Sequence, residues 1–175
     1  LQYYLADVVR SFQALGRTLT EAPFQAVALL GLLISLGAAL ASVPAGRASD
    51  RLGRKPLIYL SGAGLGLLMP FLLLFPRYAL LLALALVFGL FYGVYLAVDW
   101  ALVADVLKDP EAHATDMGLW QTAIVVPQVL AGAFGRPLDL LNAQTPGLGY
   151  QVLYLLAALF FLLGAFGVAG VRRSR

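Results

Sequence analysis

The segment PAGRASDRLGRKP, residues 44–56, gathers four cations, one acid and two glycines in a chain that otherwise carries little charge. Glycines permit a tight reversal of the chain and a close approach of helices. A carboxylate there can pair with a cation or lie at the positive end of a helix. Since such contacts form in one conformation and break in another, the pattern predicts a conformational latch; the alternative is a cationic anchor alone. The predicted latch consists of Gly46, Asp50, Arg51, Gly53, Arg54 and Lys55.

Asp99 is the second chemically informative residue, because it interrupts a long apolar stretch. It precedes Lys108 by about 13–14 Å along a helix, and half the hydrocarbon thickness of a bilayer is about 15 Å. A carboxylate at that depth costs about 2.5–3.5 kcal/mol and usually faces a cavity or a partner. Tyr92 and Tyr95 share its helical face. We expect a proton- or cation-coupling carboxylate beside aromatic substrate contacts, or an aspartate held by hydrogen bonds in helix packing.

Asp105 lies closer to the end of the same stretch, about 4–5 Å along the helix from Lys108. At this interfacial depth it is within reach of the charged segment, and we expect it to pair with Arg51 or Arg54 as part of the predicted latch. The alternative is an acid that only faces solvent. The sequence does not decide between the two.

Gln121 and Gln128 are seven residues apart and therefore share one face of a helix, with Pro127 interrupting its backbone. An amide face beside a kink predicts the lining of a polar cavity. The alternative is hydrogen bonding between neighbouring helices. Both interpretations place the two glutamines inside a membrane-spanning bundle.

Composition shows which solvent these residues require. The chain is 61% hydrophobic and 12% charged, against about 45–50% and about 25% in soluble domains, so the bilayer is its natural environment. A helix needs about 20 apolar residues to cross the hydrocarbon. Five stretches predict full spans and one predicts a partial span, which makes the fold an all-α polytopic membrane helix bundle. The partial span is 1–9, and the full spans are 23–45, 57–75, 78–107, 117–138 and 150–171.

The loop charges predict an orientation. Alternating spans place eight of the twelve Lys and Arg residues on one side: those of the charged segment, Lys108 and those of the tail 172–175. The other four are Arg10, Arg17, Arg77 and Arg136. Because an excess of Lys and Arg marks the cytoplasmic face, we expect a multi-pass protein of the cell membrane with a cytoplasmic C-terminus.

Several other chemistries are not expected. The sequence has no cysteine, its one histidine stands alone in a polar loop, and no Ser/His/Asp arrangement is present, so we expect neither an enzyme nor a metal site. SGAGLG, residues 61–66, lacks the glycine spacing and the strand of a dinucleotide site; its small residues predict close helix packing. The basic segment has no aromatic or groove-binding context for nucleic acid. We expect no cofactor.

The charged segment fits G-x-x-x-D-R-x-G-R-[KR] and resembles the signature loop of the major facilitator superfamily. Helix count and loop lengths extend the resemblance over nearly all 175 residues. It implies the second half of a twelve-helix transporter, with residues 1–175 forming one six-helix bundle whose first helix is truncated. YGVYLAVDWALVADVL and the loop after it are similar to the sugar–cation symporter and sucrose-transporter-like branches. By the same resemblance, Gln2, Tyr3 and Tyr4 line the substrate cavity.

The resemblance implies a function as well. A small solute would cross the bilayer by alternating access, coupled to a proton or another cation, between this half and a missing N-terminal half. A membrane scaffold that does not transport is one alternative. Another is a half-transporter that works only with a separately encoded half.

Overall fold

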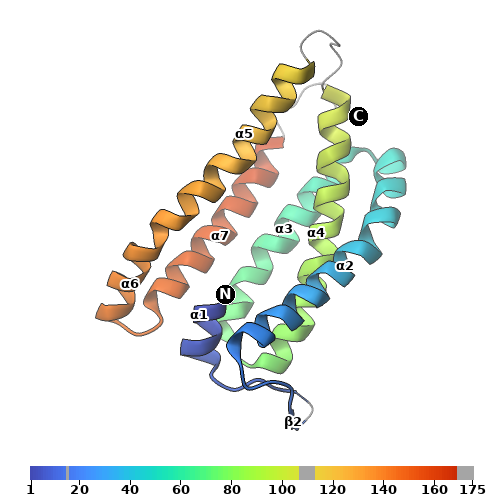
Figure 1. Ribbon diagram of the computed structural model, residues 1–175. Helices are drawn as coiled ribbons and strands as arrows, with labels where there is room; N and C mark the ends of the chain where they lie inside the picture. The colour runs from blue at the N-terminus through green and yellow to red at the C-terminus, as the bar shows by residue number, and fades with distance from the viewer. Residues whose placement is uncertain (15, 107–112, 169–175) are drawn as a thin grey trace.

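The protein is described by a computed structural model over residues 1–14, 16–106 and 113–168 (Figure 1). Within these residues, four helices are long and apolar enough to cross a bilayer. This confirms the predicted helical membrane bundle and the location of four predicted full spans. They are α2 (Pro23–Leu52), α3 (Arg54–Leu74), α4 (Tyr78–Val106) and α7 (Leu148–Gly167).

The fifth predicted span, 117–138, is not one helix. α5 (His113–Ala131) is followed by the 3-10 turn η2 (Gly132–Phe134) and by α6 (Gly135–Gln144). The helices on either side of η2 bend by 40°, and only together are they long and apolar enough for a span. Pro127 lies within α5, so the break is not at this proline. It falls at Gly132, where the missing side chain weakens the helix.

α6 occupies most of the segment between the predicted spans 117–138 and 150–171. Pro137 is in the first turn of α6, where a helix needs no N–H from it and tolerates its ring. α6 packs against α7. Residues 136–144 are therefore helical, and only a short turn separates α6 from α7.

The N-terminal residues form α1 (Gln2–Tyr4) and a π-helical turn, η1 (Leu5–Val9), in agreement with a partial helix over 1–9. A small hairpin of β1 (Gln13–Ala14) and β2 (Arg17–Thr18) leads from there to α2. The first helical segment packs on α2, and its buried residues belong to an apolar cluster that also contains residues of α2, α4 and α7. Its buried members include Tyr4, Leu5, Val9, Phe12, Ala26, Leu30, Tyr78 and Leu81.

Small residues let the helices approach closely. α2 packs along α4, and α3 along α7. A Cβ on Gly89 or on Gly93 of α4 would overlap the backbone of α2. In SGAGLG, Gly62 faces Ala165 and Gly66 faces Leu162, both of α7. The predicted role of SGAGLG in close helix packing is confirmed.

The two ends of the bundle differ in their connections (Figure 1). The junction of α2 and α3 lies at the same end as the C-terminal end of α4, while the turn 75–77, the hairpin and the α6–α7 turn lie at the opposite end. This agrees with the two groups of loops used to predict orientation. Lys108 and the tail 172–175 lie outside the described residues, and the assignment of the ends to compartments stays a prediction.

Candidate functional site

The charged segment 44–56 is mostly helical. α2 continues through Pro44 to Leu52, and α3 begins at Arg54. Only Gly53 is non-helical, with φ 89° and ψ 162°, and its N–H donates to the Ser49 carbonyl at 3.0 Å. The prediction of a loop was wrong because apolar length alone was used to end the helix. The prediction of a glycine-dependent reversal is confirmed at Gly53.

Packing explains why α2 continues past its apolar stretch. Ala45 is 4% exposed and belongs to an apolar cluster with Leu57 and Ile58 of α3 and Val98 of α4. Ser49, one turn further, is 2% exposed. One face of the charged end of α2 is therefore buried, and tertiary packing stabilises a helix that its composition does not favour.

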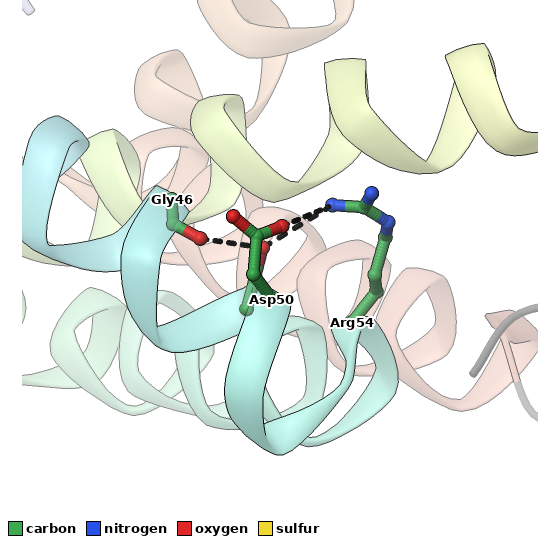
Figure 2. A network of polar contacts seen from close by, with 4 residues as sticks. Gly46, Asp50 and Arg54 are labelled. Atoms are coloured by element: carbon green, nitrogen blue, oxygen red, sulfur yellow. Dashed lines mark hydrogen bonds and ion pairs between the residues drawn. The ribbon is translucent and has the colours of Figure 1, made fainter.

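A polar network connects the end of α2 to the start of α3 (Figure 2). The Arg54 guanidinium lies 3.8 Å from the Asp50 carboxylate, and its Nη1 donates to the Ser49 hydroxyl at 3.2 Å. The Ser49 hydroxyl donates in turn to the Gly46 carbonyl at 3.0 Å. Arg54 thus spans the Gly53 break and holds the two helix ends together.

Asp50 and Arg54 are expected to contribute unequally to stability. The Asp50 side chain is 73% exposed and that of Arg54 is 17% exposed, so Asp50→Asn costs about 0.5 kcal/mol or less. Arg54→Met removes a charged donor from a partly buried network and costs about 1.5–3 kcal/mol. Unfolding of both variants by SDS titration in mixed micelles measures the difference. Equal losses would contradict the arrangement in Figure 2.

The other predicted latch residues are placed differently. Gly46 lies inside α2, and a Cβ there would meet open space, so the expectation that it permits a reversal or a close helix approach is wrong. Arg51 is exposed and Lys55 is half-buried. Asp105 belongs to α4, but its side chain lies outside the described part of the structure. Its pairing with Arg51 or Arg54 stays a prediction.

Asp99 lies on a continuous α4, together with Tyr92 and Tyr95. All three side chains are half-buried. Tyr95 is close enough to interact electrostatically with both Asp99 and Tyr92. The ring of Tyr92 stacks on Phe88 of the same helix, with the ring centroids 6.0 Å apart. The face anticipated from helical spacing therefore exists, as a row of polar and aromatic groups along one helix.

The remaining cavity candidates are on other elements. Gln121 and Gln128 are exposed on α5, and among the described residues neither amide makes a hydrogen bond. α5 contacts α4 through Trp120. Its ring forms an edge-to-face pair with the ring of Trp100, and the ring centroids are 4.5 Å apart. Gln2 is exposed, and so is Tyr3. That these side chains share one cavity with Asp99 stays a prediction.

Tyr4 belongs to an aromatic cluster that the sequence did not predict. Its hydroxyl donates to the Leu72 carbonyl of α3. Its ring packs edge-to-face on Tyr150 and Tyr154 of α7, at centroid distances of 5.6 and 5.2 Å. The Tyr150 hydroxyl donates to the Asp7 carboxylate. The i,i+4 spacing of the two α7 tyrosines and the i,i+3 spacing of Tyr4 and Asp7 were the available signals.

The chain matches a known protein family over almost its full length. The sequence profile of the Major Facilitator Superfamily matches residues 5–174, nearly the whole chain. The chain belongs to the major facilitator superfamily. Neither a comparison with curated proteins nor one with solved structures gives a match.

Membership of the superfamily establishes the general function. The chain is a multi-pass membrane protein of a family that transports small solutes across membranes. The features that first pointed to the superfamily are the residues around Gly53. In this structure they form a helix–break–helix junction held by Arg54, rather than an extended loop.

Proposed function

We propose that the chain is the second half of a secondary transporter that moves a small solute by alternating access, coupled to a proton or another cation. The observation that carries the proposal is Asp99, half-buried on a membrane-spanning helix beside Tyr92 and Tyr95. Carboxylates within spanning helices usually face a water-filled cavity or a partner, and they mark paths for ions or solutes. Asp99 is the coupling group in this proposal, and the two tyrosines contribute solute contacts.

The proposal includes the finer features of the resemblance. The solute is a sugar, the protein is located in the cell membrane with its C-terminus in the cytoplasm, and the chain performs no enzymatic reaction. Substrate binds between this bundle and an N-terminal half. The network around Arg54 acts as a latch that holds α2 and α3 together at one stage of the cycle, with Asp105 as a further partner.

Asp99→Asn in the full-length protein tests the coupling role. Proteoliposomes with an imposed proton gradient are assayed with radiolabelled mono- and disaccharides for net accumulation and for exchange without a gradient. A coupling free energy of about 1–3 kcal/mol corresponds to about 5–150-fold, so we expect accumulation to fall about tenfold or more while exchange persists. Asp116→Asn, on α5, is the control and should accumulate normally.

The assay tests the coupling role of Asp99 and the sugar assignment separately. Normal gradient-driven accumulation by Asp99→Asn would remove Asp99 from the coupling role. Absence of both accumulation and exchange of every sugar by the unaltered protein would remove the sugar assignment, whatever the variant does.

A further inference from the structure

A cavity of about 650 Å³ is lined by both polar and apolar residues. They belong to elements that Figure 1 shows at the end of the bundle opposite Gly53. It lies where η1, the end of α3, the end of α6 and the start of α7 meet. It is separate from the Asp99 face and includes residues to which no role has been assigned. The polar and aromatic side chains that line it are Tyr4, Asp7, Arg10, Asn142, Tyr150 and Gln151.

Hydrogen bonds hold the charged groups of the cavity in place, and some of their donors remain available to a ligand. The Arg10 Nε donates to the Asp7 carbonyl at 2.8 Å, and the Asp7 carboxylate accepts from Tyr150. The Asn142 Oδ1 accepts from the Gly149 N–H at 2.9 Å. Within the described part of the chain, the terminal guanidinium nitrogens of Arg10 and the amide nitrogen of Asn142 make no hydrogen bond. A cavity with one fixed cation and one fixed anion suits a zwitterionic ligand.

The depth of the cavity places this zwitterion among lipid headgroups. Tyr150 is about 3 Å along α7 from its first residue, and Leu73, which also lines the cavity, is in the last turn of α3. Tyrosines are enriched at this level of a bilayer. Large apolar side chains lie exposed on the neighbouring helices: Leu74 is 67% exposed, Leu140 is 61% and Leu153 is 39%. A ligand that fits both surfaces has a zwitterionic head and apolar chains.

We propose that this cavity binds the headgroup of an aminophospholipid such as phosphatidylethanolamine. The phosphate lies against Arg10, whose planar guanidinium matches two phosphate oxygens. The ammonium lies against Asp7 and donates N–H bonds to its carboxylate. A choline headgroup has no N–H to donate, so the site prefers ethanolamine. The acyl chains run along the exposed leucines.

The experiment measures lipid retention by the full-length protein. The protein is equilibrated in detergent micelles with equal amounts of phosphatidylethanolamine and phosphatidylcholine, and bound lipid is counted by native mass spectrometry. We expect the ethanolamine lipid to be preferred. Arg10→Gln and Asp7→Asn should each reduce its retention about tenfold, the effect of losing one charge-assisted hydrogen bond. Arg10→Lys keeps the charge but loses the planar pair of donors, so it should retain less than the unaltered protein and more than Arg10→Gln.

Two controls separate binding from folding. Arg17→Gln removes a cation from the same end of the chain outside the cavity, and its retention should be unchanged. Asn in place of Asp7 keeps an oxygen that accepts from Tyr150, so this variant should unfold at the same temperature as the unaltered protein. Equal retention of the two lipids, or unchanged retention by Asp7→Asn, would overturn the proposal. Displacement of the lipid by millimolar phosphoethanolamine would also overturn it, in favour of a water-soluble zwitterion.

Discussion

Replacing Gly89 by alanine is expected to destabilise the bundle, although glycine-to-alanine changes inside helices ordinarily stabilise. The usual gain is about 0.4–1 kcal/mol and comes from the unfolded chain. At Gly89, however, a Cβ would overlap the carbonyl group and Cα of Ile34 on α2. This neighbour is backbone and cannot rotate away, so the two helices must separate. Overpacking of this kind costs about 1–3 kcal/mol, measured as the free energy of unfolding by SDS titration.

Gly31 is the matched control, since it lies within α2 and a Cβ there would meet open space. Gly31→Ala should leave the free energy of unfolding unchanged or raise it by up to about 1 kcal/mol. If both variants were equally stable, α2 and α4 would not be in backbone contact at Gly89. The effect should also reach the candidate site, because α4 carries Asp99 ten residues further on. A displaced α4 moves Asp99, so Gly89→Ala should reduce transport as well as stability.

The long helices were predictable because the bilayer leaves so few alternatives. A segment in hydrocarbon must satisfy its own backbone hydrogen bonds, so a sufficiently long apolar stretch becomes a helix whatever packs against it. This is why α3 and α7 appear close to where hydropathy placed them. The three residues between α3 and α4 were predictable for the same reason, because Pro76 and Arg77 end the apolar stretch.

The same rule fails for polar residues next to a span. The last turns of α2 are charged, yet they are helical because Ala45 and Ser49 are buried against the other helices. α6 contains Arg136 and Asp139 and is a helix that packs against α7. At the end of α2 the contacts include Val98 of α4, far along the chain, and for α6 they come from the next helix. Local composition contains no information about them.

The candidate site, too, was predictable from the sequence only in part. Tyr92, Tyr95 and Asp99 were grouped correctly because one helix with a regular period carries all three. The contact of Asp7 with Tyr150 joins residues 143 positions apart. No periodicity within one element predicts such a contact, and only the tertiary structure brings these side chains to one cavity.

Gly46 and Gly53, the two glycines of the charged segment, are expected to respond to alanine in opposite ways. Gly53 adopts φ 89° and ψ 162°, a backbone region that is essentially restricted to glycine and costs other residues about 1–3 kcal/mol. Gly53→Ala should therefore destabilise the protein by about that amount. The strain is relieved by reorienting α3 relative to α2, which withdraws Arg54 from Ser49. Unfolding free energy and transport by the full-length protein should both decrease.

Gly46→Ala is the matched variant within the same motif. Gly46 is helical and faces open space, and alanine is favoured over glycine in a helix interior by about 0.8–1.0 kcal/mol. This substitution should leave stability unchanged or increase it, and transport should persist. A loss of stability at Gly46 equal to that at Gly53 would mean that residues 44–52 are not helical in the membrane. A transport defect of Gly46→Ala with intact stability would instead show that a second conformation of the cycle brings another helix against this face of α2.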